Sequence, residues 1–301
     1  MLFITFYGQA QTNPKPFITT WETTTPNETV TIPTVSGETY NYTVNWGDGS
    51  EMTTHTNATP PSHTYTSANT YTITISGTFP RIRFGKFNGA IDVTATTAAG
   101  QIRSVEKWGD IQWTSMKEAF AGCDNLTFNA SDVPNLSNVT DMSFIFAKAS
   151  FNGDLSKWDV SKVTNMVAMF FHSNFNGNIN KWDVSSVTDM SYMFWISSFN
   201  GDISEWDISN MTRMQDMFRE NTSMSSENYD KLLIGWSTLD EAAGETRIPP
   251  NISFWAPRHY TCKGEAARNK LIKDYSWKIS LDSKRADAID PTPDAMTLKA
   301  L

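Results

Sequence analysis

The sequence predicts a chain of mixed class, in which an N-terminal β-sandwich is followed by a solenoid of about five coils and a helical C-terminal cap. Three observations lead to this prediction. Residues 137–208 repeat with a period of 24, and a fixed period of about 20–50 residues is typical of stacked repeats. Residues 16–78 alternate in polarity and are rich in threonine, as half-buried strands are. Beyond residue 226 the repeat stops, and apolar residues recur at helical spacing.

These patterns divide the chain into five parts. Residues 1–11 are expected to be the remnant of a signal peptide, residues 12–95 the sandwich and residues 96–226 the solenoid. Residues 227–282 are expected to form the C-terminal cap, and residues 283–301, which contain two prolines and no periodicity, a flexible tail.

The first part is short and apolar. Residues 2–7 are mostly apolar and precede Gly8, Gln9 and Ala10, which place small residues at the positions that a signal peptidase requires. The usual basic start is missing, so a short apolar strand remains the alternative.

The sandwich is predicted from three strand patterns and a turn. Residues 29–32, 40–46 and 71–75 read as strands, and Asp48-Gly49 marks a tight turn after the second. Trp46-Gly47-Asp48-Gly49-Ser50, then His63-Thr64-Tyr65 and the strand at 71–75, resemble the polycystic-kidney-disease (PKD) domain, which implies an immunoglobulin-like β-sandwich. We expect the Asp48 carboxylate to accept hydrogen bonds from nearby backbone N–H groups, as in an Asx-turn.

The solenoid is predicted from three consecutive units, residues 137–160, 161–184 and 185–208. Methionine and phenylalanine columns extend the register to about five coils: Met116, Met142, Met166, Met190 and Met214, with Phe120, Phe146, Phe170, Phe194 and Phe218. Each unit contains an LxxLxL-like segment, as at 155–160, expected to be a strand. A possible helix N-cap, Ser161, and apolar residues at helical spacing follow it. One strand and one helical turn per unit describes a leucine-rich-repeat-like coil.

The units also resemble a known family. Segments such as FNGDLSKWDVSKVTNM, between Phe151 and Met166, are similar to the repeats of BspA-like bacterial surface proteins, over about residues 102–226. This resemblance implies a secreted or cell-surface protein that is not an enzyme and that mediates adhesion or protein binding.

The cap is predicted from two helical segments, residues 229–236 and 264–275, and a returning strand at 277–279. Residues 79–112 join the sandwich to the solenoid. Their apolar residues are expected either to complete the sandwich or to cap the first coil.

Composition narrows the class of function. The net charge is −8 and no run of Lys or Arg occurs, so a nucleic-acid partner is not expected. No apolar run of 18 residues is present, so no membrane-spanning segment is expected. Two cysteines and four scattered histidines show no zinc-site spacing. No metal, cofactor or catalytic residue is predicted.

Repeated columns are expected to be structural. Trp158, Trp182 and Trp206, and likewise Phe151, Phe175 and Phe199, should pack in the core. The carboxylates of Asp159, Asp183 and Asp207 should bond turn N–H groups, because a ladder of equal environments does not separate the pKa values that acid–base chemistry needs. Bound calcium is the alternative.

The candidate site lies where the repeats differ from one another. Ala147-Lys148, Phe171-His172, Trp195-Ile196 and Arg219-Glu220 follow the phenylalanine column, so we expect these positions to be exposed. Phe171, His172, Trp195 and Ile196 would form an apolar ligand-binding patch. The alternative is that the patch packs on a neighbouring part of the chain.

The sequence therefore predicts an exported surface or secreted protein whose ligand is a protein or a surface glycan. A carbohydrate-binding accessory module of a polysaccharide-degrading system is the alternative.

Overall fold

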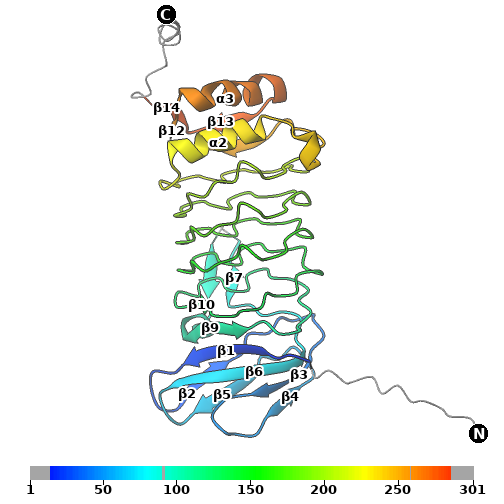
Figure 1. The fold of residues 1–301 in the computed structure, drawn as a ribbon. Coiled ribbons are helices and arrows are strands. Elements are labelled where there is room, and N and C mark those ends of the chain that lie inside the picture. The colour runs from blue at the N-terminus through cyan, green and yellow to red at the C-terminus, as the bar shows by residue number, and fades with distance from the viewer. Residues whose placement is uncertain (1–13, 90–91, 258, 286–301) are drawn as a thin grey trace, which may run out of the picture.

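The computed structural model describes residues 14–89, 92–257 and 259–285. It has a β-sheet at the N-terminal end, a stack of turn-rich layers in the middle and two helices at the C-terminal end (Figure 1). The expected signal remnant at 1–11 lies outside the described residues, as does most of the expected tail.

The N-terminal sheet has six strands in the order β10-β9-β1-β6-β3-β4. β1 pairs antiparallel with β6 on one side and with β9 on the other, whereas β10 runs parallel to β9. β2 and β5 form a separate antiparallel pair. The strands are β1 (Phe17–Glu22), β2 (Glu28–Thr31), β3 (Asn41–Asn45), β4 (Thr53–His55), β5 (Ser62–Tyr65), β6 (Thr70–Thr78), β9 (Ile102–Lys107) and β10 (Thr127–Phe128).

The predicted PKD-like, immunoglobulin-like sandwich is wrong, although its three strand segments do form strands. The strands of residues 12–95 do not divide into two comparable packed sheets. The main sheet instead recruits β9 and β10 from the next part of the chain, while β2 with β5, and β7 (Gly85–Phe87) with β8 (Val93–Ala95), form separate two-stranded pairs outside it. Alternating polarity identifies a half-buried strand but does not identify its partner, and β1 finds one partner about 85 residues later.

The turn at Asp48 is confirmed. The Asp48 carboxylate accepts a hydrogen bond from the Ser50 backbone N–H at 3.0 Å and lies 2.7 Å from Nε2 of His63. Gly47 precedes it at φ +82°, and a Cβ there would lie 2.3 Å from the Thr72 carbonyl oxygen. The turn therefore needs glycine at this point.

The repeated segments form layers joined by backbone hydrogen bonds. The N–H of Phe146 donates to the Met169 carbonyl at 3.0 Å, and that of Phe170 donates to Met193 at 3.0 Å. The rings of Phe146 and Phe170 stack in parallel with centroids 5.8 Å apart. Figure 1 shows these layers between β10 and α2. The 24-residue period thus places equivalent residues above one another.

The predicted leucine-rich-repeat-like solenoid is nevertheless wrong. Residues 129–225, all of which are described, contain no helix and no strand longer than an isolated bridge. The expected strand at 155–160 folds as a turn, in which the Trp158 N–H donates to Leu155. The expected helical turn fails because Ala168 and His172 adopt φ of 52° and 50°, in the left-handed region that no right-handed helix contains.

The C-terminal end closes the stack. Helix α2 (Ser226–Trp236) has Ser225 as its N-cap, whose side chain accepts a hydrogen bond from the Asn228 N–H. Helix α3 (Cys262–Tyr275) has Thr261 as its N-cap. Both helices were predicted from their spacing and are confirmed. The short pairs β11 (Ser253–Trp255) with β13 (Lys278–Ser280), and β12 (His259–Tyr260) with β14 (Ser283–Lys284), are parallel. A 3-10 helix, η1 (Glu241–Ala243), follows α2.

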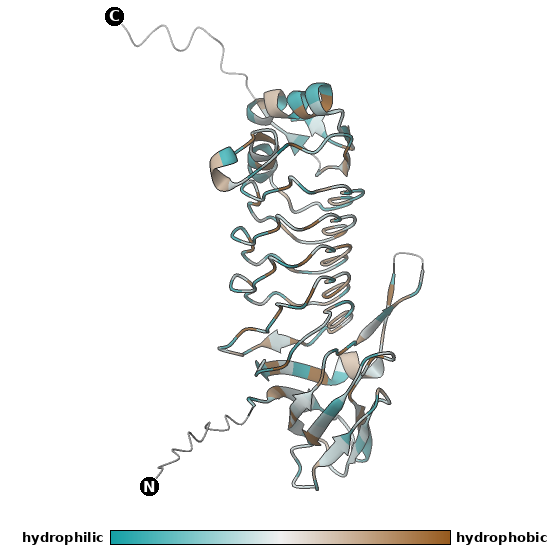
Figure 2. Ribbon diagram, turned by 90° about the vertical axis from the view of Figure 1, so that its right-hand side faces the viewer, coloured by the Kyte–Doolittle hydropathy of each residue, from teal (hydrophilic) through white to brown (hydrophobic). Residues whose placement is uncertain are grey.

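The core extends through the whole stack as one cluster, from Phe17 to Trp277. The tryptophan column (Trp158, Trp182, Trp206) and the phenylalanine column (Phe151, Phe175, Phe199) are buried in it, as predicted. A second, smaller cluster lies outside this core, against the hairpin of β7 (Gly85–Phe87) and β8 (Val93–Ala95). That hairpin precedes α1 (Thr97–Gln101) and projects beside the layers (Figure 2).

Candidate functional site

The four predicted site residues lie together on the side of the stack that faces the hairpin. The ring centroids of Phe171 and Trp195 are 5.1 Å apart, and the His172 N–H donates to the Trp195 carbonyl at 2.8 Å. The expected proximity of adjacent layers is therefore confirmed. Trp195 and Ile196 are half-buried and His172 is exposed.

Phe171 differs from its expected exposure. Its side chain is only 5% exposed and belongs to the second cluster, together with Val93 of β8 and Phe144. The sequence could not show this burial, because the cluster that contains Phe171 also includes Val93 of β8, about 80 positions earlier in the chain. The accessible part of the predicted patch is consequently shifted toward Trp195 and the C-terminal cap.

An arginine joins the patch to the cap. The guanidinium carbon of Arg219 lies 5.2 Å from the ring centroid of Trp195 and 4.8 Å from that of Trp255 in β11. Tyr192 lies on the other side, with its ring centroid 5.7 Å from that of Trp195. All four side chains are half-buried. We call Tyr192, Trp195, Arg219 and Trp255 the Trp–Arg face.

Sequence reasoning included Arg219 among the variable positions but missed Tyr192 and Trp255. Tyr192 occupies the column that holds Phe144 and Ala168 in earlier layers, so its variability could have identified it. Trp255 lies outside the repeat. The bridge between Met214 and Phe254, and the hydrogen bond from the Phe218 N–H to the Trp255 carbonyl at 3.1 Å, bring β11 onto the last layer, and no periodicity signals that contact.

The guanidinium of Arg219 lies between two indoles and is only partly engaged in hydrogen bonds. Its Nε lies 3.3 Å from Oε1 of Glu220. Within the described residues, no carboxylate or carbonyl accepts a hydrogen bond from its Nη atoms. A cation–π contact stabilises a cation by roughly 0.5–1 kcal/mol per ring at exposed sites. The face can therefore present N–H groups to a ligand acceptor.

Two carboxylates lie beneath this face. Asp216 is 4% exposed; its Oδ2 accepts from the Gln215 amide at 3.3 Å, and its Oδ1 has no partner among the described atoms. Asp189 accepts from Nε of Arg213 at 2.7 Å. Burial chiefly, and then the charges of Asp216 and Asp189, raises the pKa of the Tyr192 phenol. Tyr192 therefore stays protonated at neutral pH and can donate a hydrogen bond.

A hollow of about 480 Å³ adjoins the face on its cap side. Its apolar floor comes from Ile196, Phe218 and Ala256, and its rim carries Glu220 and the exposed Leu281. The hollow and the Trp–Arg face together form a surface that is apolar at its centre and polar at its edge.

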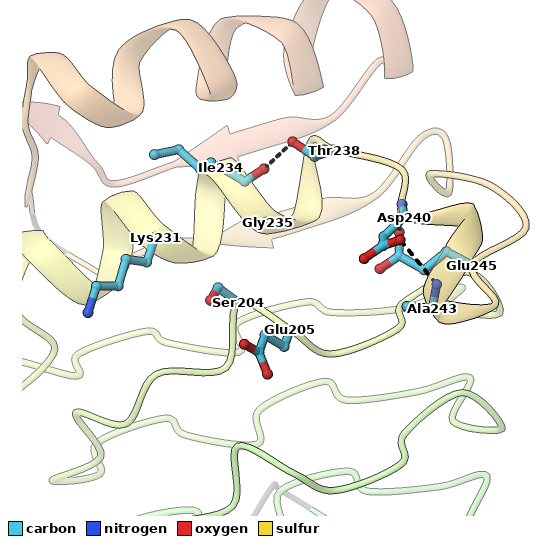
Figure 3. Close-up of a pocket in the computed structure, with 9 residues that line it drawn as sticks. All are labelled: Ser204, Glu205, Lys231, Ile234, Gly235, Thr238, Asp240, Ala243 and Glu245. Carbon is cyan, nitrogen blue, oxygen red and sulfur yellow. Dashed lines mark hydrogen bonds between the residues drawn. The ribbon is translucent and has the colours of Figure 1, made fainter.

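A second hollow of about 530 Å³ lies between α2 and the turn at Ser204 (Figure 3). Its lining includes three carboxylates, those of Glu205, Asp240 and Glu245, and the half-exposed Ile234. Most of its charged groups already have partners within the chain. Lys231 lies 3.4 Å from both Asp202 and Glu227, and Glu245 accepts from the Asp240 N–H at 2.7 Å. We infer that this hollow is part of the packing contact between α2 and the last turns of the stack.

The Glu245 carboxyl in this hollow has a raised pKa. Burial and the nearby charges of Asp207 and Asp240 raise it, against the hydrogen bond from the Asp240 N–H. Gly235 completes the contact, since a Cβ there would lie 2.1 Å from the Ser204 carbonyl oxygen. The close approach of α2 to the turn at Ser204 explains both the burial of Glu245 and the need for glycine at position 235.

The aspartate columns form turns, as predicted. The carboxylates of Asp159, Asp183 and Asp207 accept from the backbone N–H groups of Ser161, Ser185 and Ser209 at 2.8–3.1 Å. Within the part of the chain that the structure describes, no three His, Cys, Asp or Glu side chains are grouped as metal ligands. Nor does any described helix have the length and apolarity to span a membrane.

Comparison with known proteins gives one match. Residues 114–231, less than half of the chain, match a family described as "Mycoplasma protein of unknown function" (DUF285). Neither the curated proteins nor the solved structures yielded a match. The identification of the repeats as BspA-like is therefore wrong. The match that covers them carries a different description, and the layers lack the strand and helical turn of a leucine-rich repeat.

Proposed function

We propose that the chain is an exported protein that binds a partner at a surface, mediating adhesion or protein–protein contact without catalysis. One observation carries this proposal, namely the placement of Arg219 between the indoles of Trp195 and Trp255. Trp, Tyr and Arg are the residue types that dominate binding hot spots. Here all three meet on one half-exposed surface.

Export is supported by the sequence alone. The apolar residues 2–7 and the small residues Gly8 and Ala10 fit the end of a signal peptide. Separating the producing cells into cytoplasmic, membrane and medium fractions tests this part of the proposal. Recovery of the chain only from the cytoplasm would contradict it.

Binding is tested with the purified full-length chain, labelled with a fluorophore and added to intact cells. We expect saturable binding that Trp195→Ala weakens by roughly 30-fold, the equivalent of a hot spot of about 2 kcal/mol. Met52→Ala is the matched control, because Met52 is 68% exposed and lies in the N-terminal part of the chain, before β4. Equal loss in both variants, or binding unaffected by Trp195→Ala, would contradict the proposed site.

A carbohydrate ligand is the second candidate, supported by the half-exposed ring of Tyr192, whose hydroxyl is its polar end; the indole Nε1 of Trp195 is buried, so Trp195 offers ring area alone. Aromatic residues with one apolar face and one polar end suit ligands of mixed polarity. A glycan array probed with the same two variants separates this candidate from protein binding.

A further inference from the structure

The β7–β8 hairpin shows how extended polypeptide can cover one side of the stack. The ring of Phe87 in β7 lies 4.9 Å from that of Phe144, centroid to centroid. In the same layer as Phe144, Nζ of Lys148 pairs with the carboxylate of Asp92, the residue just before β8. One aromatic side chain and one carboxylate thus attach this hairpin to the layer that contains both partners.

The surface that the hairpin uses continues beyond it. The Phe144 column continues through Ala168 to Tyr192, and the Lys148 column continues through His172 to Ile196. Tyr192, Trp195 and Ile196 pack against the second cluster and yet remain half-buried. The apolar surface under the hairpin is therefore continuous with the accessible Trp–Arg face.

The backbone of this surface is already engaged. The N–H groups of Tyr192 and Ile196 donate to the carbonyls of Gln215 and Arg219 in the next layer, at 2.8 and 3.0 Å. The Trp195 N–H donates to the Tyr192 carbonyl at 3.2 Å within the layer. Because these groups have partners, a ligand cannot pair with this edge as an added strand. Recognition must use side chains.

The exposed chemistry repeats that of the covered layer. Trp195, Ile196 and Trp255 offer apolar area where Phe144 receives an aromatic ring. Arg219, in the column next to that of Lys148, offers a cation, and a planar guanidinium can bind a carboxylate through two parallel hydrogen bonds. Glu220 faces only its Nε, so the Nη groups are the part of the face that suits an acidic group on the ligand.

We propose that the Trp–Arg face binds an extended segment of a partner polypeptide that brings one aromatic side chain and one carboxylate. The proposal rests on the proposed binding function and names its ligand class. The aromatic side chain packs on Trp195 and Ile196, and the carboxylate bonds the Nη groups of Arg219. The hairpin, an extended polypeptide held by the same two groups, is the reason to prefer a peptide over a glycan.

The test uses the full-length chain and a defined peptide array. Each immobilised peptide has ten residues drawn from Gly, Ser and Thr, with one Trp and one Asp at a given spacing. A parallel set carries Asn in place of Asp. We expect at least one spacing to bind, and its Asn counterpart to bind about 10-fold more weakly, since a charge-assisted pair contributes on the order of 1.4 kcal/mol.

Two variants test which side chains of the face contact the aromatic ring and the carboxylate of the peptide. Trp195→Ala should weaken binding roughly 30-fold, and Arg219→Gln should bind the Asp and Asn peptides equally. Met52→Ala should bind as wild type. Thermal unfolding of each variant shows whether it is folded. Because Arg219 is only partly buried, the Arg219→Gln result remains informative if Trp195→Ala does not fold.

Two outcomes would overturn the peptide proposal. The first is the absence of binding at every spacing. The second is peptide binding that both variants leave unchanged. If no peptide on the array binds the chain, while a glycan array shows binding that depends on Trp195, the proposed ligand class is wrong but the proposed binding function stands. If neither array nor intact cells bind the chain, the proposed function itself fails.

Discussion

The indole N–H of Trp182 donates a hydrogen bond to the backbone carbonyl of Leu155, 27 residues earlier, across 3.0 Å. Trp206 makes the same bond to Ile179 at 3.1 Å, and Trp236 of α2 makes it to Ile203 at 3.2 Å. Each tryptophan thus joins its layer to the preceding one. Helix α2 closes the stack by placing its last residue at the next step of this series.

Trp182→Phe should lower stability without affecting binding. The substitution retains most of the buried ring but removes the donor, and because the Leu155 carbonyl still accepts from the Trp158 N–H, the loss should be about 0.5–1.5 kcal/mol, the net value of one hydrogen bond. Trp182→Ala should cost more, about 3–5 kcal/mol, because it also opens a cavity. Denaturant unfolding measures both. A variant that unfolds like wild type but loses its ligand would show that the tryptophan column is a binding ladder.

Acid should destabilise the layers through their turn aspartates. Hydrogen bonds from the Ser161 hydroxyl and N–H lower the pKa of Asp159, and those from Ser156 lower the pKa of Asp154. A carboxyl whose pKa is depressed in the folded state stabilises the fold above its unfolded pKa of about 3.9, and this contribution is lost as pH falls through the lower folded value.

The matched variant is Asp154→Asn, because the equivalent turn in the next unit is made by Asn178, which accepts from Asn180 N–H at 3.1 Å. We expect the variant to be less stable than wild type at pH 7, and the difference to shrink as the pH falls below the unfolded pKa and through the lowered folded pKa of Asp154. Unfolding curves at a series of pH values measure this difference. Identical pH dependence of the two proteins would show that Asp154 contributes nothing to acid sensitivity.

The repeated part of the molecule was the most predictable from sequence. The period of 24 placed Phe146, Phe170 and their equivalents in one buried column, because a shared environment selects the same residue in each unit. The turn conformation within a unit was not predictable. Phe144, Ala168 and His172 adopt positive φ, and none of these residue types marks a left-handed position as glycine does.

Long-range pairings were also beyond the sequence. The hydroxyls of Thr20 and Ser104 meet where β1 and β9 pair, yet nothing local to either strand selects the other. The same limit explains the site. Trp195 was found because the repeats disagree at its position, whereas Trp255 and the hairpin that packs on Phe144 belong to unrepeated segments that only the tertiary structure brings there.

Phe171→Ala and Trp195→Ala should separate stability from binding. Phe171 is buried in the second cluster, so its truncation should cost about 3–5 kcal/mol. Trp195 is half-buried and its truncation should cost less in stability, while it removes the ring that a ligand contacts. Thermal unfolding together with binding of labelled protein to cells measures both effects. A larger loss of stability from Trp195→Ala than from Phe171→Ala would reverse the roles given to the two rings.

Oxidative footprinting tests the central claim most directly, because it reports which side chains a ligand covers. The full-length chain is exposed briefly to hydroxyl radicals, alone and bound to its cellular partner or best peptide, and the oxidation of each residue is measured by mass spectrometry. Binding through the Trp–Arg face predicts that oxidation of Trp195 and Trp255 falls on binding, while that of the exposed Met52 stays constant and the buried Trp182 is protected in both states. Unchanged oxidation of Trp195 and Trp255, with protection elsewhere on the surface, would contradict the account.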